Sequence, residues 1–146
     1  MNTPDLLTWG LRLAGLGQLF VAAITFWLRR IVDWNADLAK LRPLNRCIVH
    51  TYGFYIQAIN AVFGLICLLQ PRELLAKTPL AADVTLLIAV YWLVRLTLGF
   101  IYYDTHEITT QRALYRLGEY FFECLFAAQV VALLAAFAYN VGWIID

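Results

Sequence analysis

The sequence predicts an all-α fold: a four-helix transmembrane bundle that forms one domain over residues 1–146. The composition supports this, because 62% of the residues are hydrophobic and only 14% are charged, too few to cover a soluble domain of this length. The chain also divides into four apolar segments, each close to the ~20 residues that a helix needs to cross a bilayer. These segments use nearly the whole chain, so we expect no second globular domain.

We expect the four spans to be joined by short connections. The first is too long for a signal peptide, and Asp5 stands where such a peptide carries basic residues, so we expect it to be retained. The second ends before Pro71, and Thr109 or Thr110 can cap the fourth. The expected spans are about residues 8–28, 47–69, 84–103 and 114–140.

The distribution of lysine and arginine predicts that both termini lie on the non-cytoplasmic side. The first and third connections carry more basic residues than the opposite side of the membrane. The basic residues of these two connections are Arg29, Arg30, Lys40, Arg42, Arg46, Arg112 and Arg116, against Arg12, Arg72 and Lys77 on the other side.

The first connection contains the pattern of a short helix. Asp33 can cap it, Trp34, Leu38 and Leu41 share one face, and Pro43 interrupts the pattern. We expect a connector that lies on the membrane surface. The alternative is a basic amphipathic patch that contacts anionic lipid.

Three charged residues stand inside the expected spans: Arg95 in the third, and Glu119 and Glu123 in the fourth. An ionised group in hydrocarbon costs about 2.5–3.5 kcal/mol, so each should be paired, neutralised or turned toward a cavity. At ~1.5 Å per residue, Arg95 reaches a depth of about 12 Å and Glu123 a similar depth of about 10 Å. We therefore predict an ion pair between them, and a local pair between Glu119 and Arg116.

A polar stripe on the second span should face these charges. His50, Gln57 and Asn60 recur at spacings of three and seven, which places them along one helix face. Gln57 and Asn60 are interpreted mainly as interhelical hydrogen-bonding groups, whereas structural and functional roles both stay open for the ion pair. The predicted polar seam comprises His50, Gln57, Asn60, Arg95, Glu119 and Glu123.

No cofactor is expected. Gly15 and Gly17 lack the third glycine of a dinucleotide motif, no phosphate-binding loop is present, and the three cysteines form no CxxC pair that would indicate a metal site. His50 and His106 could together ligate a haem, but His106 stands in an acidic loop, which argues against it. With a net charge of +1, we expect no nucleic acid partner.

Small residues indicate where helices approach one another. Ala128, Ala132 and Ala136 repeat every four residues, as do Gly10 and Ala14. We interpret both patterns as packing within the bundle. The alternative is an interface with a partner membrane helix or in a homo-oligomer.

The central half of the chain contains a further set of residues in the second and third spans. They are Thr51–Tyr52–Gly53–Phe54–Tyr55, Asn60, Phe63–Gly64–Leu65, Pro71, Tyr91–Trp92, Arg95–Leu96 and the run 100–104. In these residues the chain resembles a group of uncharacterised four-span bacterial membrane proteins. The resemblance implies the topology and a location in the bacterial inner membrane, and it implies no activity.

Two classes of function remain. The first is an accessory membrane protein that binds lipid or a partner helix and catalyses nothing. The second is a small membrane enzyme or proton-coupled carrier, with Glu119 or Glu123 as acid or base, His50 as proton shuttle and Arg95 as counter-charge. The second class requires one cavity that all four side chains reach.

Overall fold

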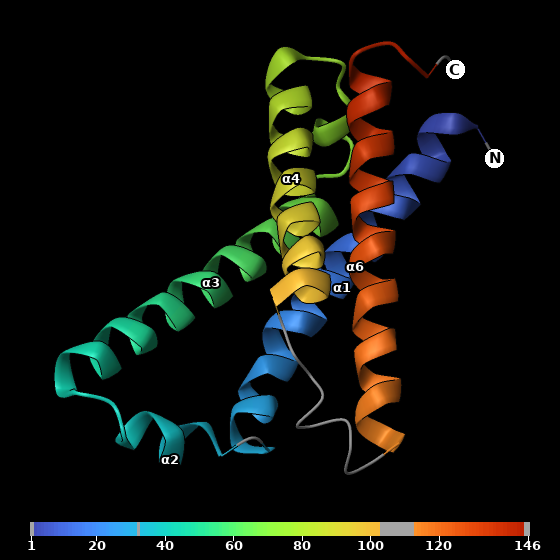
Figure 1. The fold of residues 1–146 in the computed structure, drawn as a ribbon. Helices are drawn as coiled ribbons and strands as arrows, with labels where there is room; N and C mark the ends of the chain where they lie inside the picture. The colour runs from blue at the N-terminus through green and yellow to red at the C-terminus, as the bar shows by residue number, and fades with distance from the viewer. Residues whose placement is uncertain (1, 32, 103–112, 145–146) are drawn as a thin grey trace.

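The computed structural model describes residues 2–31, 33–102 and 113–144, and throughout these ranges the regular structure is helical. Four helices in the described ranges are long and apolar enough to cross a membrane, as the sequence predicts. A short helix α2 and a 3-10 turn η1 occur in two of the connections (Figure 1). The elements are α1 (Thr3–Ile31), α2 (Trp34–Ala39), α3 (Pro43–Leu69), η1 (Glu73–Leu75), α4 (Pro79–Tyr102) and α6 (Ala113–Asn140).

Three of the long helices begin at least four residues earlier than their predicted spans, and for two of them a proline explains the difference. Pro43 opens α3 and Pro79 opens α4. A proline is well suited to a first turn, where its missing N–H has no partner to lose and its fixed φ is already helical. The Thr78 hydroxyl also accepts a hydrogen bond from the Ala81 N–H at 3.2 Å, which caps the start of α4.

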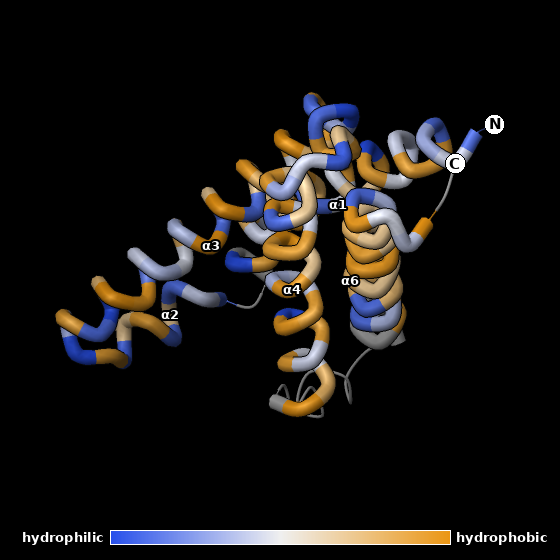
Figure 2. Tube along the Cα trace, turned by 90° about the horizontal axis from the view of Figure 1, so that it is seen from above, coloured by the Kyte–Doolittle hydropathy of each residue, from blue (hydrophilic) through white to orange (hydrophobic). Residues whose placement is uncertain are grey.

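The long helices form two packed pairs. α1 lies against α3, α4 lies against α6, and α1 also packs on α6. The first half of α3 extends away from α4 and α6 (Figure 1). In Figure 2 hydrophobic positions run along all four long helices, with hydrophilic positions between them. At the end of the bundle where α3 diverges, α1, α4 and α6 form a three-helix arrangement.

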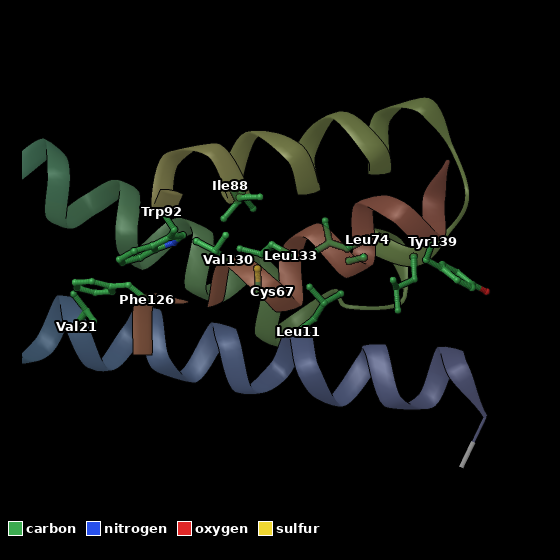
Figure 3. Close-up of a cluster of buried hydrophobic side chains, with 13 residues drawn as sticks. Leu11, Val21, Cys67, Leu74, Ile88, Trp92, Phe126, Val130, Leu133 and Tyr139 are labelled. Carbon is green, nitrogen blue, oxygen red and sulfur yellow. The ribbon is translucent and has the colours of Figure 1, made fainter. Parts of the chain in front are cut away.

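The core is centred where all four long helices meet (Figure 3). Leu11, Ile88 and Leu133 are fully buried there. Cys67 brings α3 into the same cluster, as a small apolar side chain. Burial of this apolar surface by helices from both halves of the chain makes the bundle one unit.

Two glycines allow α1 and α3 to cross closely. A Cβ atom on Gly15 would lie 2.7 Å from the Gly64 carbonyl oxygen and 2.8 Å from the Leu68 nitrogen. A Cβ atom on Gly64 would in turn lie 3.0 Å from the Gly15 oxygen. Backbone atoms cannot move aside as a flexible side chain can, so this crossing requires residues without a Cβ.

Small residues also line the contact between α1 and α6. A Cβ atom on Gly10 would lie 3.9 Å from the Ala132 Cβ, and Ala136 is fully buried. At these positions the small-residue patterns serve packing inside the bundle. Ala128 is exposed.

The end of the bundle at η1 is closed by hydrogen bonds; we call it the closed end. The Asn140 side chain donates to the Leu74 carbonyl at 2.7 Å and accepts from the Lys77 N–H at 3.0 Å. Leu74 and Leu75 are buried beneath this connection. Lys77 has a φ of 54°, in the left-handed region. One asparagine therefore fixes the irregular backbone between α3 and α4 against the end of α6.

The predicted short helix is present as α2, but its capping differs from the expectation. Asp33 precedes α2 with a φ of 47° and makes no side-chain cap hydrogen bond. At the other end, the Arg46 guanidinium donates to the Leu38 carbonyl at 3.0 Å and to the Ala39 carbonyl at 2.8 Å. Arg46, one of the basic residues from which the membrane orientation is predicted, thus also caps the C-terminal end of α2.

α2 also carries an exposed ion pair. The Lys40 Nζ lies 2.8 Å from the Asp37 Oδ1, and this hydrogen bond raises the pKa of Lys40. Both side chains are exposed to solvent, so the pair contributes little to stability.

Candidate functional site

A pocket of about 240 Å³ lies between α1, α4 and α6, at the end of the bundle opposite η1. It contains all three charged residues predicted inside the spans: Arg95, Glu119 and Glu123. The rest of its lining is almost entirely apolar. The remaining lining residues are Val21, Ile24, Thr25, Leu28, Leu96, Gly99, Phe122 and Phe126.

Helical periodicity explains why these residues meet. α1 contributes positions i, i+3, i+4 and i+7 counted from Val21, and α6 contributes the same four positions counted from Glu119. Each set forms one face of its helix. α4 adds Arg95, Leu96 and Gly99, which also lie within one turn. One face from each of three helices thus encloses the pocket.

The predicted ion pair between Arg95 and Glu123 is not formed. No salt bridge of 4.0 Å or less joins these two described residues. The Arg95 guanidinium carbon instead lies 5.2 Å from the centre of the Phe126 ring, whose face attracts a cation. Phe126 stands almost one turn deeper on α6 than Glu123, so Arg95 contacts the neighbouring helix below the level of that carboxylate.

Glu123 is partly buried and makes no hydrogen bond or ion pair with any residue that the structure describes. Glu119 lines the same pocket one turn nearer the start of α6. The charged side chains of the pocket are thus two carboxylates and one guanidinium. When all are ionised, their formal sum is −1.

The predicted seam is divided in two because the first half of α3 diverges from α4 and α6. Gln57 and Asn60 are buried, but neither lines the pocket. Asn60 accepts a hydrogen bond from the Tyr91 hydroxyl at 2.6 Å, which joins α3 to α4 as the interhelical interpretation predicts. His50 is exposed on the first half of α3 and is also absent from the pocket lining.

Two expected partners lie outside the described part of the chain. His106, the second histidine of the haem alternative, falls within residues 103–112. The side chain of Arg116, the expected partner of Glu119, is also not described. Among the residues that the structure describes, no group of three or more histidine, cysteine, aspartate or glutamate side chains is arranged to hold a metal ion.

Sequence reasoning missed two buried glutamines. Gln18 on α1 is fully buried, and Gln129 on α6 is 1% exposed. The signal was present, since each is an amide within an apolar span, as Gln57 is. Four buried side chains carry polar atoms without a hydrogen-bond partner in the described structure: Gln18 Oε1, Gln57 Nε2, Trp92 Nε1, and both amide atoms of Gln129.

These atoms are energetically important. A buried donor or acceptor left without a partner costs about 1–3 kcal/mol. Thr85 shows the usual solution, because its hydroxyl donates back to the Ala81 carbonyl of its own helix at 2.8 Å. The glutamines and Trp92 have no such local solution.

Comparison with known proteins gave no match: no family model, curated protein or solved structure is similar enough to this chain to place it in a family.

Proposed function

We propose that this protein is a multi-pass membrane protein that binds an amphipathic molecule with a zwitterionic head group in the pocket between α1, α4 and α6. One observation carries the proposal: both signs of charge occur within a pocket whose walls are otherwise apolar. Such a lining matches a ligand that has a charged head and an apolar tail. Catalysis is not required for this role.

The depth of the charges supports a membrane lipid as the ligand. Arg95 lies seven residues before the end of α4, or about 10 Å along the helix. Glu119 lies six residues after the start of α6, or about 9 Å. A head group held at these levels leaves its tail in the hydrocarbon region, beside the apolar walls of the pocket.

The combination of charges favours a zwitterion. A purely anionic head group would be attracted by Arg95 but repelled by Glu119 and Glu123. A phosphate and an ammonium on the same head group satisfy both signs, since the phosphate can accept from Arg95 while the ammonium donates to Glu123. We therefore propose an aminophospholipid of the phosphatidylethanolamine type.

The orientation and compartment belong to the same proposal. The positive-inside rule, applied to the sequence, puts the pocket end of the bundle on the cytoplasmic side. The resemblance stated above supports the bacterial inner membrane. Lipid binding at this end would then draw on the cytoplasmic leaflet.

The alternative function, an enzyme or proton-coupled carrier, is less well supported. It required Glu119, Glu123, Arg95 and His50 around one cavity, and His50 is absent from the pocket lining. Without its proton shuttle, this mechanism loses the residue best suited to transfer protons near neutral pH.

A lipid competition experiment tests the proposal. The purified protein is reconstituted in nanodiscs of equal phosphatidylethanolamine and phosphatidylglycerol, extracted gently, and analysed by native mass spectrometry for retained lipid. We expect enrichment of phosphatidylethanolamine, and loss of that enrichment in Glu123→Gln. Glu73→Gln is the matched control, because Glu73 is exposed on η1, outside this pocket.

Equal retention of the two lipids by the unmodified protein would refute the proposed ligand class. The same enrichment in Glu123→Gln would show that the lipid binds elsewhere on the protein.

A further inference from the structure

One helical turn deeper than the pocket, three helices each bury one hydrogen-bonding side chain. Gln18 lies three residues before Val21 on α1, Trp92 three before Arg95 on α4, and Gln129 three after Phe126 on α6. None of the three side chains lines the pocket, and each is at most 1% exposed. We call them the buried amide layer.

Contacts join the three helices that carry this layer. A Cβ atom on Gly17, the neighbour of Gln18, would lie 2.7 Å from the Gln129 Nε2, so the Gln129 amide rests against the α1 backbone. The Trp92 and Phe126 rings are stacked with centres 5.2 Å apart. In Figure 3 the indole nitrogen of Trp92 is turned toward Val130, the residue after Gln129.

The unpartnered atoms of the layer include both donors and acceptors. Among the described residues, Gln129 Nε2 and Trp92 Nε1 carry N–H groups without a partner, whereas Gln18 Oε1 and Gln129 Oε1 are acceptors without one. The only hydrogen bond from Gln18 Nε2 in the described structure is a long one, 3.9 Å to the Cys67 Sγ. Exchanging the oxygen and nitrogen of Gln129 would form no hydrogen bond, since neither atom has a partner in the part of the chain that the structure describes.

The chemistry of these groups selects the ligand. A carbonyl can only accept hydrogen bonds, and a lone ion would be buried without a counter-charge. A hydroxyl group or a water molecule can accept from the Trp92 and Gln129 N–H groups and also donate to a glutamine oxygen. Buried water in proteins typically makes about three such hydrogen bonds.

We propose that the buried amide layer is a hydroxyl-binding site in the centre of the bundle, occupied by water or by the hydroxyl group of a bound amphiphile. This site is distinct from the charged pocket and does not depend on which lipid the pocket binds. Phe126 lines the pocket and stacks on Trp92, so its ring separates the two sites.

Nuclear magnetic resonance tests this site directly. Protein labelled with ¹⁵N is reconstituted in nanodiscs of perdeuterated lipid, and proton magnetisation is transferred from water. We expect transfer to the Trp92 indole N–H and to the Gln129 side-chain amide. Trp92→Phe assigns the indole signal. The backbone N–H of Leu133 is the internal control, because Leu133 is fully buried in an apolar part of the core.

A second preparation distinguishes the two sources of the hydroxyl group. With protonated lipid, transfer from lipid protons instead of water identifies the hydroxyl of a bound amphiphile. Gln129→Leu should reduce the transfer to Trp92 severalfold and leave Leu133 unchanged, whereas Phe126→Ala should accelerate exchange at Trp92.

The proposal is overturned if neither water nor lipid transfers magnetisation to the Trp92 indole in the unmodified, folded protein. It is also overturned if a folded Gln129→Leu variant leaves that transfer unchanged. The measurement on the unmodified protein decides the question even where a variant does not fold.

Discussion

The two ends of this bundle differ in the hydrogen-bond partners of their polar side chains. At the closed end, the polar atoms of Asn140 bond to the backbone of the η1 connection, and Leu74 and Leu75 are buried beneath them. At the pocket end, the first half of α3 has diverged, and Glu123 lies in a largely apolar pocket without a hydrogen-bond or ion-pair partner in the described structure. Groups that do not optimise stability are typical of binding sites, so this difference is consistent with the binding role that we propose for the pocket end.

The largest expected effect is at the crossing of α1 and α3, where backbone atoms of the two helices approach closely. Gly15→Ala would force a Cβ atom against backbone atoms of α3, and overpacking of this kind costs about 1–3 kcal/mol. We expect a lower free energy of unfolding, measured in micelles by denaturant titration.

Gly118→Ala is the matched control for this substitution at the pocket end. A Cβ atom on Gly118 meets no atom of the described residues within 4 Å, so alanine should be neutral or should stabilise α6 by up to about 1 kcal/mol through helix propensity. Equal destabilisation by both substitutions would contradict the close crossing.

An intermediate effect is expected at the closed end. Asn140→Leu removes the hydrogen bonds to Leu74 and Lys77, and a typical hydrogen bond contributes about 1 kcal/mol. We expect a loss of that order in the free energy of unfolding. Asn45→Leu, at an exposed position on α3, is the control and should change stability little. If both variants unfold alike, Asn140 does not hold the connection in place.

The smallest effect on stability is expected in the pocket. Because Glu123 forms no ion pair with Arg95, Glu123→Gln should change the free energy of unfolding by no more than about 0.5 kcal/mol. Breaking a buried ion pair would instead cost about 3–5 kcal/mol. Thermal unfolding of this variant in micelles therefore distinguishes the observed arrangement from the pair predicted from the sequence.

Residue pattern alone predicted the four long helices and identified three of the residues that line the pocket. Apolar length identified the four long helices, and charge within apolar segments identified Arg95, Glu119 and Glu123, which the structure brings to one pocket. The depth of a residue along its helix, however, does not specify which residue of the neighbouring helix a long side chain contacts. Arg95 lies over Phe126 instead of meeting Glu123, and no spacing rule distinguishes these outcomes.

The sequence by itself determined the helices, their apolar character and the residues that share each face, because these depend on composition and on the period of 3.6 residues per turn. Only the tertiary structure decided which faces meet. Close packing at Gly15 and Gly64 fixes the crossing of α1 and α3, while the first half of α3 points away from α4 and α6. That divergence separates His50 from the charged pocket. The sequence does not predict it, because the direction of a helix depends on contacts between distant segments and not on local pattern.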